Sequence, residues 1–324
     1  LKNRWKILDM KLESNNNVDL EFVRNNSITN EIVLVDGAPR SAKSLVGQII
    51  GSFDRIEIER MDPIFESISM LYSYNKISKD AAKSLLRREI DIKLYESMIS
   101  RNINFKFSDR TSIFNSTKKF TYLKRLFKKE GKSVLDRIND KKPIFQLQTH
   151  DTLQRSDLFF AVFKNELKIV EMVRHPVDLI SSMNLHGYGT GIGIDPLLWE
   201  LAIKSQKYDV PYYSHKWVDE YLKVSKIDRI IKIVDNLTKE VKEKYNSLSK
   251  KKQDQIFFIP FEQFVTDPKD YIYKLSKFLN TSITKKTKLA MKKQRIPRIL
   301  DDSKRNKKYK LITRDASDDY IKIF

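Results

Sequence analysis

Apolar residues recur along this 324-residue chain with two spacings, one typical of strands and one typical of helices. The strand signal consists of short aliphatic and aromatic runs that end at turn-forming or charged residues. A run of this kind is too short for a helix and long enough to cross a sheet. The predicted strands are 32–36, a short one near 55–59, 143–148, 167–173 and one that begins at Ile256.

The helical signal is clearest in 78–100, where apolar residues return every three or four positions. Strands that alternate with such helices indicate an α/β protein with three layers, in which helices flank a mostly parallel central sheet. Ligands of such sheets bind beyond the carboxyl ends of the strands. The predicted helices are 43–52, 62–100, 117–129 and 268–279, with helices also dominating 194–250.

The predicted organisation is a polar, Asn-rich lead-in at 1–30 and a single domain at 31–324. The domain includes a helical insertion at about 60–140, which is a candidate cap on the substrate side. A basic segment at 285–310 contains twelve Lys or Arg residues and two acidic residues. Four of the eight glycines lie in 187–193, which we interpret as a mobile loop beside the site or as a simple linker.

A candidate anion site directly follows the strand at 32–36. The chain makes a Gly-Pro turn there and then starts an apolar helix near Lys43. Backbone N–H groups at a helix start have no partner within the helix, and with the helix dipole they attract an anion. Arg40 and Lys43 add positive charge, and Ser41 and Ser44 add hydroxyl donors. The loop therefore predicts a phosphate ligand.

A Walker A loop is one interpretation of this segment, since Gly37 and Lys43-Ser44 have its spacing. Ala42 occupies the position of the second glycine of that motif. The run Pro39-Arg40-Ser41-Ala42-Lys43-Ser44 more closely resembles the 5′-phosphosulfate loop of sulfotransferases that use 3′-phosphoadenosine 5′-phosphosulfate (PAPS). Their usual sequence is Pro-[Lys/Arg]-Ser-Gly-Thr-Thr.

A second segment favours the sulfotransferase interpretation. The strand at 167–173 leads into Arg174, and Pro176 and Asp178 suit the first turn of the helix that follows. With Ser182, these residues resemble the family's 3′-phosphate motif, Arg-x-Pro-x-Asp followed by Ser four residues later. An ATP-dependent kinase has no 3′-phosphate to bind. The stretch 256–268 is also similar to a late strand and turn of the family, and it supports the fold only.

The resemblance implies a role for each matching residue. It places Arg40 beside the transferred sulfonate, and it wraps Ser41, Ala42, Lys43 and Ser44 around the 5′-phosphate. Arg174 and Ser182 would hold the 3′-phosphate. The family's final basic loop is not recognisable in this sequence, and Arg305 or Lys307 are candidates to replace it.

The general base has two candidate positions. Gln148-Thr149-His150 follows the strand at 143–148 and resembles the Lys-Thr-His of cytosolic sulfotransferases, whose His is the base. We expect this strand to neighbour the one that ends at Arg174. In relatives with the Pro-Arg-Ser-Gly loop the base is instead a Glu soon after the first helix, and Glu59 and Asp62 are nearest to that position.

The composition of the chain excludes several functional classes. The chain has no cysteine, which excludes disulfides and thiolate catalysis and weakly favours a cytoplasmic location, although it begins at Leu1 and leaves room for an upstream signal or anchor. No run approaches a membrane span, and the four histidines lack a zinc spacing, so we expect no metal. The net charge of +20 attracts polyanions, yet no nucleic-acid module is recognisable.

The sequence therefore predicts an enzyme that moves a sulfuryl group from PAPS to an acceptor hydroxyl, or an amine, and releases 3′,5′-bisphosphoadenosine. The acceptor stays open among saccharide, lipid, tyrosine and small molecule, and so does the oligomeric state. The alternatives are an ATP-dependent P-loop kinase and a non-catalytic, basic polyanion-binding protein.

Overall fold

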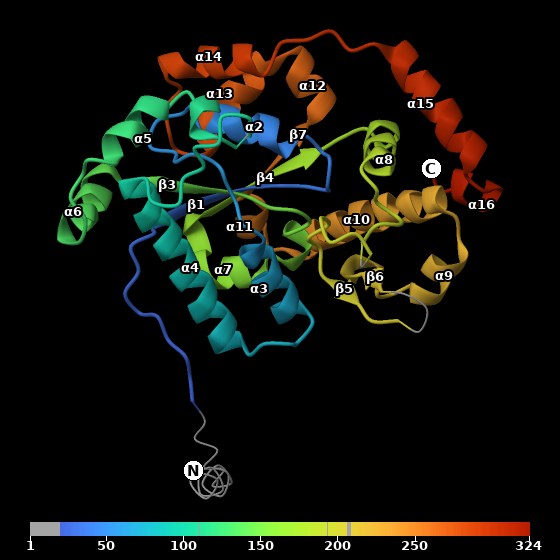
Figure 1. Ribbon diagram of the computed structural model, residues 1–324, viewed down its shortest axis with the longest axis horizontal. Coiled ribbons are helices and arrows are strands. Elements are labelled where there is room, and N and C mark those ends of the chain that lie inside the picture. The colour runs from blue at the N-terminus through green and yellow to red at the C-terminus, as the bar shows by residue number, and fades with distance from the viewer. Residues whose placement is uncertain (1–19, 110, 193, 206–208) are drawn as a thin grey trace, which may run out of the picture.

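A computed structural model describes residues 20–324 except 110, 193 and 206–208, and all structural statements below concern these residues. Five parallel strands form the central sheet in the order β2-β3-β1-β4-β7 (Figure 1). Helices cover both faces, which confirms the predicted three-layer α/β fold. The strands are β1 (Glu31–Asp36), β2 (Arg60–Met61), β3 (Ile144–Gln148), β4 (Leu167–Val173) and β7 (Ile256–Pro260).

The strand β1 lies at the centre of the sheet and pairs with β3 on one side and β4 on the other. The expectation that β3 and β4 are neighbours is therefore wrong. The physical reason lies in the composition of β1, because Ile32–Val35 is a continuous apolar run that is buried on both faces. Parallel strands end at one edge of a sheet, so the ends of β3, β1 and β4 still lie together.

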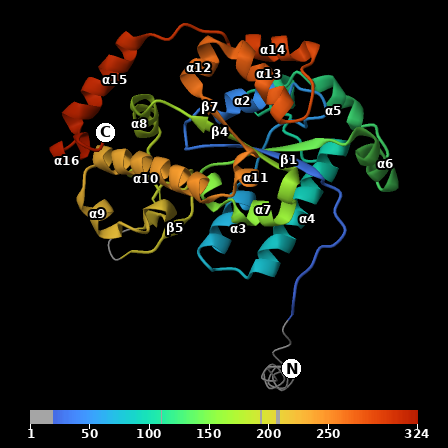
Figure 2. The same ribbon diagram turned by 180° about the vertical axis from the view of Figure 1, so that it is seen from behind.

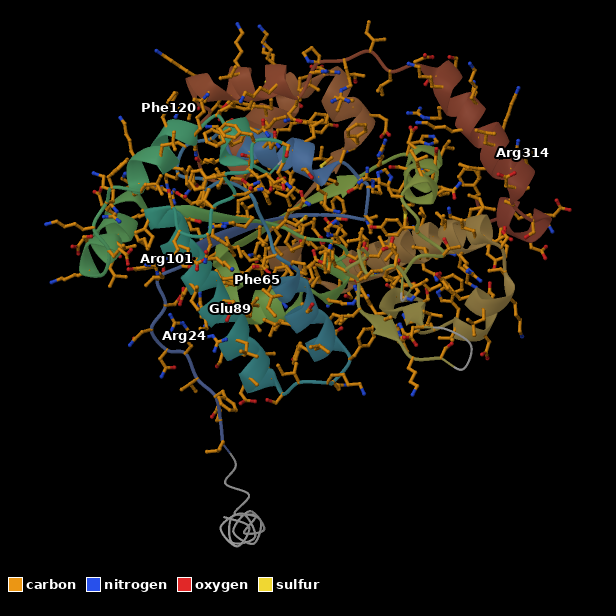
Figure 3. All side chains as sticks on the ribbon, in the orientation of Figure 1. Arg24, Phe65, Glu89, Arg101, Phe120 and Arg314 are labelled. Atoms are coloured by element: carbon orange, nitrogen blue, oxygen red, sulfur yellow. The ribbon has the colours of Figure 1, made fainter. Side chains whose placement is uncertain are left out.

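One face of β1 presents Ile32 and Leu34 to a layer of helices that includes most of the predicted insertion. The buried apolar stripe of α4 and the side chain of Phe65, which lies in the interior in Figure 3, fill this layer. The insertion is thus largely a structural layer on the sheet. The helices of this face are α3 (Pro63–Ser73), α4 (Lys79–Ile99), α6 (Lys132–Lys141) and α7 (Asp157–Phe163).

The opposite face presents Val33 and Val35 to the helix that starts at the phosphate loop and to three helices from the C-terminal third. Both views place these helices on one side of the sheet (Figures 1 and 2). The helices are α2 (Lys43–Ile50), α12 (Phe261–Thr266), α13 (Pro268–Phe278) and α14 (Lys285–Lys293). The short α5 (Lys119–Arg125) lies near the edge of the sheet, where Arg125 forms an ion pair with the buried Glu57.

A third apolar cluster lies beside the sheet and joins α8 (Pro176–Leu185) to the long α10 (Lys226–Ser247). The C-terminal helices α15 (Asp302–Asp315) and α16 (Asp318–Ile321) pack onto it through Ile312 and Tyr320. This cluster supports the helix that follows β4. No described helix combines the length and the apolar character needed to cross a membrane.

Two local expectations differ from the structure. The strand near 55–59 is reduced to a single bridge at Ile56, and the edge strand β2 starts only at Arg60, because Glu57 turns away to pair with Arg125. The part of 194–250 that precedes α9 (Val218–Lys223) contains a small antiparallel pair, β5 (Ala202–Ile203) with β6 (Val210–Pro211). The remaining helix, α11 (Lys250–Gln253), precedes β7.

The described part of the lead-in, residues 20–30, is tied to α4 by one buried carboxylate. Asp91 accepts hydrogen bonds from Ser27 Oγ at 2.8 Å and from the backbone of Thr29 at 3.0 Å, and its carboxylate is 2.7 Å from the Arg24 guanidinium. Residues 1–19 of the predicted lead-in lie outside the described residues.

Candidate active site

The phosphate loop runs from the end of β1 to the start of α2. Gly37 has φ of 137°, and a Cβ there would lie 2.6 Å from the Met172 carbonyl oxygen, so only glycine fits. Arg40 and Ala42 both adopt the left-handed region, with φ of 69° and 75°. These conformations turn the chain sharply before the first N–H groups of α2, which begins without a side-chain cap. An anion is the partner that such a helix start lacks.

The Lys43 side chain is committed to the loop itself. Its Nζ donates to the carbonyl oxygens of Gly37 at 2.6 Å and Ala38 at 2.8 Å. Burial lowers the pKa of Lys43, while the carboxyl groups of Asp36, Asp151 and Glu171 raise it. Lys43 therefore stabilises the loop and the acidic groups behind it.

The two predicted phosphate motifs are in direct contact. Arg174 donates from Nη1 to the Arg40 carbonyl oxygen at 2.6 Å. Arg40 donates from Nε to Ser182 Oγ on α8 at 3.2 Å. Residues that follow β1 and β4 are thus joined at one place, where Arg40 and Arg174 line the same cavity.

A cavity of about 680 Å³ opens at this edge of the sheet. Among the described residues that line it, five carry a positive charge and Glu59 alone is acidic. Ser41 Oγ is buried there and has no hydrogen-bond partner among the described residues, and neither does Arg174 Nε. These donors fit an anionic ligand. The five lining cations are Arg40, Lys43, Arg174, Lys293 and Arg298.

The predicted base candidates occupy different places. His150 follows β3, lines the cavity and contacts Glu66. Glu59 also lines the cavity and packs against Gly47 of α2, where a Cβ would lie 1.7 Å from Glu59 Oε1. Asp62 does not line the cavity, because it caps α3 through the Ile64 N–H at 3.2 Å and lies 3.1 Å from Lys93 Nζ.

The predicted C-terminal ligands lie apart from the cavity lining. Arg305 donates to Asp178 at 3.0 Å and so fixes α15 to α8, and Lys307 is exposed. Lys293 and Arg298 line the cavity instead, and the Arg298 guanidinium lies 6.0 Å from the ring centroid of Phe261. The sequence analysis missed these two residues because every part of the basic segment 285–310 carries the same local signal.

The glycine-rich segment is anchored rather than detached. Tyr188 lines the cavity and donates its hydroxyl to Glu200 at 3.1 Å, and burial raises the pKa of Tyr188. Gly189 has φ of 86°, and a Cβ added to it would lie 2.9 Å from the Lys226 carbonyl oxygen. Gly193, the last glycine of this segment, lies outside the described residues.

The sequence as a whole matches the model of the sulfotransferase domain over residues 33–318. The chain belongs to the sulfotransferase domain family. Enzymes of this family transfer sulfuryl groups. No group of three or more His, Cys, Asp or Glu among the described residues is arranged to hold a metal ion.

Solved sulfotransferases resemble this sulfotransferase only distantly. The sulfotransferase domain from the curacin biosynthetic pathway has 10% identity and a TM-score of 0.46, over 81% of this chain and 77% of that one. Sulfotransferase STF9 from Mycobacterium avium has 10% identity and a TM-score of 0.40, over 90% and 78%. No curated protein matches the sequence. The family assignment therefore depends on the sequence match.

The first prediction concerns Ala42, which stands where the sulfotransferase loop usually has Gly. A left-handed conformation costs a non-glycine residue about 1–2 kcal/mol, partly offset by the greater freedom of glycine in the unfolded chain. We expect Ala42→Gly to raise the free energy of unfolding by about 0.5–1 kcal/mol, measured by urea denaturation. Ala82→Gly inside α4 is the control and should destabilise the protein. A lower free energy of unfolding in Ala42→Gly would contradict the claim that the left-handed conformation of Ala42 is strained.

The second prediction concerns Asp151, a buried residue whose Oδ1 has no partner among the described residues. Burial raises its pKa to about 7, and Asp36 acts in the same direction. The native state therefore holds a proton that the unfolded state releases above its ordinary pKa near 3.8. Stability should fall as the pH rises from about 4 to about 7.

Asp151→Asn removes this titration and suits the left-handed backbone, whose φ is 51°. We expect the variant to match the wild type near pH 4 and to exceed its stability by on the order of 3 kcal/mol above pH 7. Urea denaturation at both pH values provides the measurement. A stability difference that does not change with pH would contradict the raised pKa.

Proposed function

We propose that this sulfotransferase transfers a sulfuryl group from PAPS to an acceptor hydroxyl, or an amine. The observation that carries the proposal is the contact between the two phosphate motifs, from Arg174 to Arg40 and from Arg40 to Ser182. A donor with phosphates at both its 3′ and 5′ positions needs two anion sites side by side. The family assignment favours this function over a kinase or a polyanion-binding protein.

The residues present fit PAPS. The N–H groups of 42–44 would hold the 5′-phosphate, together with Ser41 Oγ, which has no hydrogen-bond partner among the described residues. Arg174, whose Nε has no hydrogen-bond partner in the part of the chain that the structure describes, and Ser182 would hold the 3′-phosphate. PAPS supplies the sulfuryl group. Transfer breaks the S–O bond to the 5′-phosphate, forms a bond from the acceptor oxygen to sulfur, and moves the acceptor proton to a base.

Within this proposal His150 is the base. It follows β3, the strand that pairs with β1, and it lines the same cavity as Arg40. A neutral imidazole takes a proton readily near neutral pH, and a nearby cation stabilises the negative charge that develops on the leaving phosphate. Glu59 is the rival base, since it also lines the cavity, and Asp62 is the more remote one. Saccharides, lipids, tyrosine and small molecules remain the acceptor classes.

The direct test of the proposal has two parts. In thermal unfolding, 3′,5′-bisphosphoadenosine should raise the melting temperature more than AMP or ATP with Mg²⁺, because only the bisphosphate engages both sites. In a transfer assay with ³⁵S-labelled PAPS and a panel of acceptors, at least one acceptor class should gain label. Equal stabilisation by ATP with Mg²⁺, or no transfer to any acceptor class, would contradict the proposal.

A third prediction separates the candidate C-terminal ligands. Arg298→Ala removes a cation from the cavity lining, and a hydrogen bond to a charged group contributes about 1.5–3 kcal/mol. We expect this variant to weaken bisphosphate binding about 10- to 100-fold in isothermal titration calorimetry. Lys307→Ala is the matched control, because Lys307 is exposed and does not line the cavity. A larger loss in Lys307→Ala would return the role to the predicted residue.

A further inference from the structure

A carboxylate that the sequence analysis did not name holds His150 in place. Glu66 Oε1 lies 3.0 Å from His150 Nδ1 and accepts a hydrogen bond from the backbone N–H of His150 at 2.8 Å. One oxygen thus contacts both the ring and the main chain of the same residue. These two contacts fix the ring relative to its own backbone.

The backbone around His150 is held independently by the end of β1. Asp36 accepts from Thr149 Oγ1 at 2.9 Å and from the Leu153 N–H at 2.6 Å, on the two sides of His150. The turn that carries His150 is therefore fixed to the strand that also carries the phosphate loop. Any displacement of the ring then depends on rotation of the side chain, which the contact with Glu66 opposes.

Glu66 reaches this position from the first turn of α3, on the insertion layer. Asp62 caps that helix and Pro63 occupies its first position, so the direction of the first turn is set locally. Glu66 itself does not line the cavity, whereas His150 does. Of the two side chains, the imidazole is therefore the one that borders the cavity.

The contact also decides where the ring proton lies. A carboxylate only accepts hydrogen bonds, so the 3.0 Å contact requires the proton on Nδ1. The other nitrogen, Nε2, is then free of a proton and able to accept one.

We infer that Glu66 is the positioning residue of this sulfotransferase, which fixes the His150 ring and holds it in the Nδ1–H form. The inference rests on the proposed function, in which His150 is the base. It assigns a catalytic purpose to α3, the first helix of the insertion. It also separates Glu66 from the rival acids, since Glu66 acts through His150 and does not itself reach the acceptor.

The test compares the wild type with Glu66→Gln, which keeps the shape of the side chain, and Glu66→Met, which removes the acceptor. The ¹⁵N chemical shifts of labelled histidine report the tautomer directly, and His150→Asn identifies the signal. We expect the wild type to show the Nδ1–H form. Both variants should shift towards Nε2–H, because a neutral amide accepts more weakly or donates to Nδ1 instead.

Turnover provides the second readout. We expect kcat to fall about 10-fold in Glu66→Gln and about 10²-fold in Glu66→Met, which are smaller losses than removal of the base itself. The KM for PAPS and the affinity for bisphosphate should stay unchanged. Glu89→Gln changes a half-buried acid of α4 that pairs with Arg88 (Figure 3), and this matched control should leave both readouts unchanged. Urea denaturation confirms that each variant is folded at the assay temperature.

Three outcomes would overturn the inference. The His150 tautomer could be the same in all variants, or kcat could be unaffected by the loss of the carboxylate. Alternatively, Glu66→Gln could abolish transfer while His150→Asn retains it, which would make Glu66 the base. Absence of transfer by the wild type would contradict the proposed function instead, and the tautomer measurement would still decide whether Glu66 controls the ring.

Discussion

Replacement of His150 by Asn is expected to lower kcat by about 10²–10⁴-fold, because it removes the proposed general base. Asn keeps much of the size of the ring and can still donate a hydrogen bond to Glu66 Oε1, but it cannot take a proton near neutral pH. The proposed phosphate sites lie on other segments, at 40–44 and at Arg174. The affinity for 3′,5′-bisphosphoadenosine should therefore be unchanged, and calorimetry together with the ³⁵S transfer assay measures both quantities.

Glu59, the rival base, provides the control for the His150→Asn experiment. Glu59→Gln changes an acid that lines the same cavity and keeps its shape against Gly47. If His150 is the base, this variant should retain most of its turnover. Near-normal turnover in His150→Asn combined with a large loss in Glu59→Gln or Asp62→Asn would transfer the role to the acidic pair.

Replacement of Arg40 by Ala is expected to lower kcat by about 10²–10³-fold with a much smaller effect on donor affinity. Arg40 is exposed at the cavity and its guanidinium is held by Ser182 Oγ at 3.2 Å. A cation that is already in position stabilises the charge that develops on the leaving phosphate without first having to reorganise. Stopped-time transfer assays at saturating PAPS give kcat, and calorimetry with bisphosphate gives the affinity.

Arg174→Ala is the comparison variant, and it should weaken bisphosphate binding more than it lowers kcat. Because Arg174 also supports the Arg40 carbonyl oxygen at 2.6 Å, some loss of turnover is expected with it. Arg314→Ala, on the exposed surface of α15 (Figure 3), controls for the loss of one charge. The reverse pattern, with affinity lost in Arg40→Ala and turnover lost in Arg174→Ala, would exchange the roles of the two motifs.

The sequence was sufficient to predict the sharp loop between β1 and α2, because its parts are neighbours in the chain. A buried strand, a sharp turn and a helix start occupy about a dozen consecutive residues, and their backbone donors converge by local geometry alone. The same holds for the segment from β4 to Ser182 on α8. Hydrophobic spacing likewise predicted the parallel strands and the stripe of α4, since burial on a sheet imposes these periods.

Strand order depended on the whole fold. The sequence placed the strands that end near His150 and Arg174 side by side, but β1 separates them because its continuous apolar run is buried from both faces. The two motifs still meet the cavity, since all three strands end at one edge. The sequence could therefore predict that the two motifs lie near one another without the correct order of the strands.

The sequence by itself determined the family and the α/β architecture, and it located the two segments that we propose as phosphate motifs. Only the tertiary structure decided which distant side chains complete the site. Glu66 meets His150 across 84 residues, and Arg298 reaches the cavity although every part of its basic segment carries a similar charge. Such contacts leave no periodic or local signal, because they are set by how α3 and the C-terminal segment pack on opposite faces of the sheet.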